Sequence, residues 1–128
     1  MMFDSDVLIW ATRGNLEAAA LINSAPDRSM SIVSVMETLQ GARSVLDIRI
    51  VKQSLNELGL RILPLSERIG YLAAALIEEY ALPNGLRVDD ALIAATAMEA
   101  GEVLATGNLR HFQPVRSLEI KAFRPPRV

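Results

Sequence analysis

Short apolar runs alternate along the chain with longer segments of helical period, and this alternation limits the folds that the chain can adopt. Runs at 30–33, 61–65, 103–106 and 118–123 have the length and composition of buried strands, and an earlier strand ends at Asp4. Strands that are separated by helices pair in parallel, because a parallel connection has to cross back over the sheet. The sequence therefore predicts a mostly parallel central sheet covered by helices.

The clearest helix prediction starts at Ser66, whose hydroxyl is a good N-cap. The apolar residues from Ile69 to Tyr80 keep the spacing of one helix face, and Pro83 is predicted to stop the helix. Further helices are predicted at 7–12 after Asp6, at 35–43 after Ser34, at 45–58, and at 91–100 after Asp89 or Asp90, with Gly101 as a C-terminal cap.

The chain has 128 residues, which is the size of one domain. We predict a single domain over 1–123 and a short basic, proline-containing tail over 124–128. The hydrophobic fraction of 51% is high for a small soluble protein and suggests that a partner covers some apolar surface. No apolar run approaches the roughly 20 residues of a membrane span, and the start is acidic where a signal peptide would be basic. We therefore expect a cytoplasmic protein that does not enter a membrane.

The absence of cysteine narrows the chemistry. It excludes disulfides, thiolate catalysis and cysteine-bound zinc, and leaves oxygen atoms as the natural metal ligands. A net charge of −2 argues against a broad basic surface for nucleic acid. However, eleven of the 13 basic residues are arginines, whose planar side chain can bind phosphate through two hydrogen bonds. A local basic rim is compatible with this composition.

Three acidic residues stand where the predicted strands end and the next helices begin. Asp4 ends the first strand, and Glu37 and Asp90 lie in the first turns of later helices. Strand ends and helix starts gather at one edge of an open parallel sheet, so these acids are expected to meet there. Clustered carboxylates repel one another and raise their pKa values unless a cation neutralises them. Mg²⁺ or Mn²⁺ fits such oxygen ligands.

Structural roles compete with this interpretation. Glu37 could equally serve a capping box with Ser34, in which its side chain accepts a hydrogen bond from the backbone of Ser34. Asp89 and Asp90 could be ordinary helix-start residues, which is the preferred reading for Asp89. Trp10 is expected in the core rather than as a base-stacking platform. A surface or packing role is preferred over a phosphate contact for His111.

Four segments, in order, resemble the motifs of the PIN-domain family and, within it, of the VapC toxins of bacterial toxin–antitoxin pairs. They are 3–10 (FDSDVLIW), 31–41 (SIVSVMETLQG), 90–97 (DALIAATA) and 104–112 (LATGNLRHF). Asp4, Glu37 and Asp90 fall on acidic positions of these motifs. Asp6 replaces the usual asparagine, and Asn108 stands at a position that is acidic in some relatives.

The resemblance implies a three-layer α/β/α domain that acts as a Mg²⁺ or Mn²⁺ dependent endoribonuclease. It also implies a homodimer, an RNA substrate and a cognate VapB-like antitoxin that holds the enzyme inactive. Asp4 and Asp90 would be the principal metal ligands, and Glu37 the third catalytic residue, which positions the metal or orients a water. The expected supporting residues are Ser5, Thr106 and Asn108, and the candidate RNA contacts are Arg43 and Arg110.

Two rival functions remain open at this point. A haloacid-dehalogenase-like phosphatase would use Asp4 and Asp6 as an Asp-x-Asp motif, with Asp89 and Asp90 as its distal acidic pair. Its lysine is hard to place, because Lys52 is the only lysine between the two acidic motifs and it lies in a predicted helix. The other rival is a PIN-like binding module without catalysis, for which Asn108 provides some support and against which the three retained acids argue.

Overall fold

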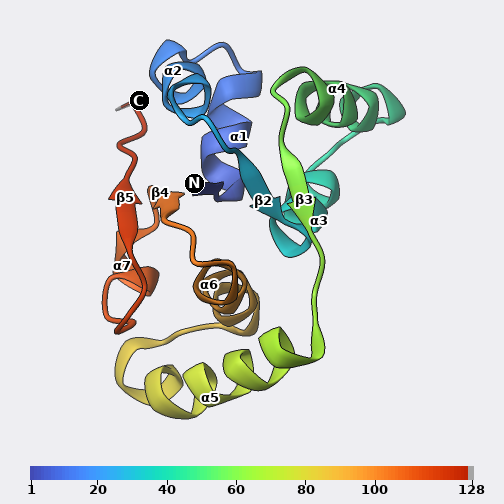
Figure 1. Cartoon of the computed structure of the whole chain (residues 1–128). Helices are drawn as coiled ribbons and strands as arrows, with labels where there is room; N and C mark the ends of the chain where they lie inside the picture. Colours follow the sequence, from blue (N-terminus) through green and yellow to red (C-terminus); the bar gives the residue numbers. More distant parts are fainter. Residues whose placement is uncertain (127–128) are drawn as a thin grey trace.

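All five strands of the sheet run parallel, in the order β3-β2-β1-β4-β5 (Figure 1). The structure is a computed structural model and describes residues 1–126. The strands are β1 (Met2–Phe3), β2 (Ser29–Ser31), β3 (Arg61–Leu63), β4 (Leu104–Thr106) and β5 (Ile120–Ala122). The predicted parallel sheet is therefore confirmed.

Helices cover both faces of this sheet. They are α1 (Ser5–Thr12), α2 (Leu16–Ser24), α3 (Ile32–Gln40), α4 (Val45–Glu57), α5 (Glu67–Asn84), α6 (Val88–Ala100) and α7 (Leu109–Phe112). In Figure 1, α1, α2 and α4 lie on one side of the strands, and α5 and α6 lie on the other. The resulting three layers confirm the expected α/β/α architecture.

The layers follow from the alternation of side chains along each strand. Met2 and Leu104 face a core cluster built with α5 and α6, whereas Phe3 and Ala105 face a second cluster built with α1 and α2. All four of these residues have no exposed surface. Buried apolar residues on both faces explain why the strands read as short continuous apolar runs.

The second strand and the helix after it were predicted at the wrong residues. The strand was expected at 30–33 and the helix at 35–43 after Ser34, but α3 already begins at Ile32. Ser31 is the N-cap, and its Oγ accepts a hydrogen bond from the backbone N–H of Val33. Ile32 and Val33 are apolar because the start of the helix is packed against the core, so composition alone could not separate strand from helix here.

Other helix ends also differ from their predictions. Asp4 rather than Asp6 is the N-cap of α1, and α6 begins at Val88, ahead of both Asp89 and Asp90. Pro83 lies inside the last turn of α5, which ends at the left-handed Gly85. A proline removes one backbone donor, which the end of a helix tolerates better than its middle.

The short helices α2 and α7 were not predicted. The helix α7 is a single turn and has no side-chain hydrogen bond at its N-cap, so little local sequence distinguishes it from a loop. No helix in the part of the chain that the structure describes is long and apolar enough to cross a membrane. Of the predicted tail at 124–128, residues 124–126 are exposed and 127–128 lie outside the described residues.

The order of the strands creates a crevice at one edge of the sheet. From β1 the chain steps outward to β2 and β3, and it then returns to place β4 on the other side of β1. Asp4 follows β1 directly, and Thr106 ends β4. The carboxyl ends of two strands at such a reversal are the usual location of a ligand site in open α/β sheets.

Candidate functional site

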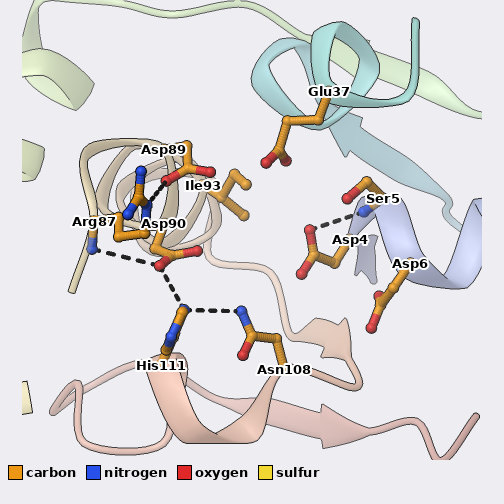
Figure 2. Close-up of a pocket in the computed structure, with 10 residues that line it drawn as sticks. All are labelled: Asp4, Ser5, Asp6, Glu37, Arg87, Asp89, Asp90, Ile93, Asn108 and His111. Carbon is orange, nitrogen blue, oxygen red and sulfur yellow. Dashed lines mark hydrogen bonds and ion pairs between the residues drawn. The ribbon is translucent and has the colours of Figure 1, made fainter. Parts of the chain in front are cut away.

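A pocket of about 200 Å³ lies at this reversal of strand order. Figure 2 shows its side chains, which come from the starts of α1 and α6, from α3 and from the segment after β4. The pocket brings together all three predicted catalytic acids, Asp4, Glu37 and Asp90. The full lining is Asp4, Ser5, Asp6, Glu37, Arg87, Asp89, Asp90, Ile93, Asn108 and His111.

Asp4 is held by hydrogen bonds from three elements. Its Oδ1 accepts from the backbone N–H of Ser5 at 2.8 Å and, at 3.5 Å, from the hydroxyl of Ser34. Its Oδ2 accepts from the hydroxyl of Thr106 at 2.8 Å. Burial raises the pKa of Asp4, and these hydrogen bonds oppose the rise because they favour the charged form. Ser5, through its backbone, and Thr106, through its side chain, thus both donate to Asp4.

Asp90 is fixed on the opposite side of the pocket. Its Oδ2 lies 2.9 Å from Nδ1 of His111 and accepts a longer hydrogen bond, 3.4 Å, from the backbone N–H of Arg87. Burial raises the pKa of Asp90, the neighbouring Asp89 raises it further, and His111 lowers it. The side chain is thus rigidly placed, with one oxygen engaged by its neighbours.

Glu37 faces the pocket from α3 without a structural task of its own. The predicted capping box is wrong, because Ser31 caps this helix and Ser34 lies inside it. The Oε1 atom of Glu37 is buried and has no hydrogen-bond partner in the described residues. Burial, followed by the acidic neighbours Asp89, Asp4 and Asp90, raises the pKa of Glu37 to about 8. Of the three acids it carries the least compensated charge.

Two further acids line the pocket. Asp6 accepts hydrogen bonds from the backbone N–H groups of Val7 and Gly107, both at 2.8 Å, and burial followed by the charge of Asp4 raises its pKa to about 6. Asp89 lies in the first turn of α6, as the preferred reading had it, with its Oδ1 3.9 Å from Nε of Arg87. The nuclease interpretation of the sequence had given neither residue a role, and only the phosphatase alternative had placed Asp6 and Asp89 at a site.

His111 joins the site, although a surface or packing role was preferred for it. Besides its contact with Asp90, its Nδ1 lies 3.1 Å from Nδ2 of Asn108, a predicted supporting residue. Asn108, the N-cap of α7, and His111 are three residues apart, a spacing that puts both side chains on one face of a helical turn. This spacing is the feature of the sequence that could have indicated their contact. The pairing of His111 with Asp90 is tertiary and leaves no mark in the local sequence.

The candidate RNA contacts Arg43 and Arg110 are exposed and are not among the residues that line the pocket. Arg87 does line it, with 76% of its side chain exposed. Trp10 packs against the second core cluster, as expected, and its ring lies 5.8 Å from the guanidinium carbon of Arg13.

The chemistry of the pocket suits a hard divalent cation. Within residues 1–126, no three acidic or histidine side chains already form a closed ion site. Nevertheless, Oε1 of Glu37 has no partner among the described residues, and the pKa values of Asp4, Glu37 and Asp90 are raised because their ionised forms are destabilised. A bound cation would neutralise the charge of these ionised forms. The ligands on offer are carboxylate oxygens, which Mg²⁺ and Mn²⁺ prefer.

The phosphatase alternative fails on its lysine. Lys52 is exposed on α4 and does not line the pocket. The acidic pair at 89–90 also belongs to the first turn of a helix rather than to a loop after a strand. The lining of the pocket therefore contains no lysine, which a phosphoaspartate enzyme of that class would need.

Comparison with known proteins agrees with the geometry. A chain in a toxin–antitoxin complex from Klebsiella pneumoniae is 26% identical, with a TM-score of 0.77 over 91% of this chain and 93% of that one. VapBC-1 from nontypeable Haemophilus influenzae has 21% identity and a TM-score of 0.78 over 94% and 96%. VapBC2 from Rickettsia felis, bound to a promoter DNA fragment, has 18% identity and a TM-score of 0.75 over 96% and 98%.

No curated protein matches the chain by sequence. The PIN-domain profile, by contrast, matches residues 1–116, which is nearly the whole chain and includes every acid of the pocket. The sheet order and the helical layers are thus those of a known fold. The chain belongs to the PIN-domain family.

Proposed function

We propose that this protein is the toxin of a toxin–antitoxin pair and acts as a divalent-metal-dependent endoribonuclease that hydrolyses RNA phosphodiester bonds. The observation that carries the proposal is the meeting of Asp4, Glu37 and Asp90, from three separate elements, in one pocket of a PIN domain. Asp4 also caps α1, and Asp90 also accepts from the backbone N–H of the N-cap residue Arg87 of α6. Glu37 makes no such local contact among the described residues.

Asp4 and Asp90 would hold the ion, Mg²⁺ or Mn²⁺. Both are only 6% exposed, and each has an oxygen oriented by neighbours, Thr106 for Asp4 and His111 for Asp90. Hydrogen bonds of this kind fix the orientation of a carboxylate and so hold its oxygens in position to bind a metal ion. When bound, a divalent ion makes water more acidic and stabilises charge that develops on the phosphate oxygens.

Glu37 would act on the attacking water. Its Oε1 is free to accept a hydrogen bond, because no described group donates to it. A bound divalent ion would oppose the rise in the pKa of Glu37, because positive charge favours the ionised form, and the ionised carboxylate could then take up a proton from water. We assign to Glu37 the orientation of water and the acceptance of its proton.

The substrate would approach over the rim of the pocket. Arg87 is an exposed arginine in the lining of the pocket and can pair with a phosphate, because its one ion pair within residues 1–126, to Asp89, is long at 3.9 Å. Arg43 and Arg110 remain candidate contacts for more distant phosphates. An RNA substrate and a protein antitoxin would both be met in the cytoplasm.

Exposed apolar side chains support protein partners. Leu16, Val45 and Leu46 are each more than 60% exposed on α2 and α4, and Met36, Leu65 and Val88 border a separate apolar groove beside the acids. We propose that a VapB-like antitoxin and a second copy of this chain, as a homodimer, cover such surfaces. The structural neighbours that are toxin–antitoxin complexes support the first of these partners.

The test is RNA cleavage by the purified protein with Mg²⁺ or Mn²⁺. We expect cutting by the wild type, and its loss in Asp4→Asn, Asp90→Asn and with EDTA. Asp47→Asn, which changes an aspartate outside the pocket, is the matched control and should cut normally. If the wild type cuts nothing that the two active-site variants spare, the nuclease proposal fails. Antitoxin binding by such an inert protein would then favour the binding-module alternative.

A further inference from the structure

Asp6 makes a contact that neither helix capping nor metal binding explains. Its Oδ2 accepts the backbone N–H of Gly107 at 2.8 Å, a residue 101 positions away in the sequence. The bond ties the first turn of α1 to the turn between β4 and α7. A first-turn aspartate needs no such distant donor to stabilise its helix.

The turn is built to allow this close approach. A Cβ atom at position 107 would lie 2.7 Å from Oδ2 of Asp6 and 3.0 Å from the carbonyl oxygen of Phe123. Gly107 is not among the glycines with positive φ, so the position requires glycine for space rather than for backbone conformation. The contact thus requires an acceptor at position 6 and a residue without a side chain at position 107.

The Thr106–Asn108 turn is linked to both proposed metal ligands, directly to Asp4 and through His111 to Asp90. On one side the hydroxyl of Thr106 donates to Asp4 and accepts from the backbone N–H of Asn108, at 2.8 and 3.0 Å. On the other side the Asn108 amide lies beside His111, which contacts Asp90. A displacement of the turn would therefore disturb Asp4 and Asp90 together.

Asp6 is badly placed to serve as a ligand itself. Each of its oxygens already accepts a backbone N–H group, that of Val7 or that of Gly107. In Figure 2 its side chain extends away from Glu37. Any effect of Asp6 on the proposed metal ligands therefore acts through the Thr106–Asn108 turn that it holds at Gly107.

We propose that Asp6 is a positioning residue, which holds the Thr106–Asn108 turn through Gly107 and so keeps Asp4 and Asp90 in register. The inference rests on the proposed nuclease function for its effect on turnover. Removal of groups that orient metal ligands lowers activity about tenfold to a hundredfold, and we expect a loss of this size for Asp6→Ala. KM for RNA should change little, because the exposed phosphate contacts stay in place.

The experiment compares Asp6→Ala with Asp6→Asn, whose single side-chain oxygen can keep the bond from Gly107 while giving up the local bond from Val7. Asp6→Ala should lower kcat and move the Gly107 amide proton resonance upfield, and Asp6→Asn should restore both. Asp47→Ala is the matched control: Asp47 is also a first-turn aspartate that accepts a backbone N–H, from Arg43 at 2.9 Å, but it lies outside the pocket. It should leave kcat unchanged.

Three results would overturn the inference. One is wild-type kcat in Asp6→Ala. Another is an Asp6→Asn protein as impaired as Asp6→Ala, since the charge and not the bond would then matter. The third is an unmoved Gly107 resonance in Asp6→Ala. If Asp6→Ala does not fold, Gly107→Ala breaks the same contact from the other side and should lower kcat equally.

The resonance measurements separate this inference from the proposed function. If the wild type cuts no RNA, the nuclease function fails, but the Thr106, Gly107 and His111 resonances of Asp6→Ala still decide whether Asp6 holds the turn. If the wild type cuts RNA and those resonances stay in place, only the role of Asp6 fails.

Discussion

Nδ1 of His111 lies 2.9 Å from Oδ2 of Asp90, and this contact joins a one-turn helix to one of the two proposed metal ligands. An ionised carboxylate can only accept, so Nδ1 of His111 is the donor when Asp90 is charged, and it then cannot also accept from the Asn108 amide 3.1 Å away. Burial and Asp89 raise the pKa of Asp90, and His111 opposes that rise. His111 thereby favours the ionised form of Asp90 and orients its Oδ2.

Replacement of His111 by alanine should therefore lower kcat for RNA cleavage by about tenfold to a hundredfold. Because the contact lowers the pKa of Asp90, its loss should also move the acidic limb of the pH–rate profile to higher pH. The neighbouring variant Gln113→Ala, at an exposed position, is the control. A profile that keeps its acidic limb in place would show that His111 does not act through Asp90.

Metal-free protein should lose stability as the pH rises. The pKa of Glu37 is about 8 in the folded protein, against an ordinary value of 4.5, so the folded form binds its proton more tightly. The associated stability is fully present below pH 4.5 and is lost as the pH rises through about 8. Thermal unfolding in EDTA should show this decline between pH 5 and 9, and Glu37→Gln should flatten it. An unchanged slope in Glu37→Gln would contradict the assignment.

Divalent ions should stabilise the folded protein through the two ligand carboxylates. At a concentration about 100 times its Kd, an ion that binds only the folded form adds roughly 2.7 kcal/mol to the free energy of unfolding. We expect Mg²⁺ or Mn²⁺ to raise the Tm of the wild type at pH 8 and to leave Asp4→Asn and Asp90→Asn nearly unaffected. Equal shifts in all three proteins would place the ion elsewhere.

The corrected start of α3 can be tested by two serine variants. Ser31→Ala removes the N-cap and should cost about 1 kcal/mol of stability. Ser34→Ala should cost less, since Ser34 is inside the helix and its only side-chain contact is the 3.5 Å bond to Asp4. Urea unfolding at pH 7 measures both, and a larger cost for Ser34 would restore the original capping assignment.

Topology explains why Asp4 and Asp90 could be predicted from the sequence. Both follow from rules that act on the order of elements: strand ends and helix starts meet where the strand order reverses. The start of α3 could not be predicted, because Ser31 and Ser34 are both good caps and only burial of Ile32 and Val33 decides between them. The contacts of His111 with Asp90 and of Asp6 with Gly107 could not be predicted for a related reason. The partners are distant in sequence and are brought together by packing rather than by a local pattern.

The hydrogen bonds from Thr106 to Asp4 and from Gly107 to Asp6 join residues 102 and 101 positions apart. Contacts of such long sequence separation form late, because most of the chain has to be ordered before the two ends can meet. During synthesis, the segment with Thr106 and His111 leaves the ribosome after α1 to α6. A nascent chain that has already folded α1 to α5 would still lack these groups, and so the catalytic constellation would be assembled only after residues 106–111 have been made.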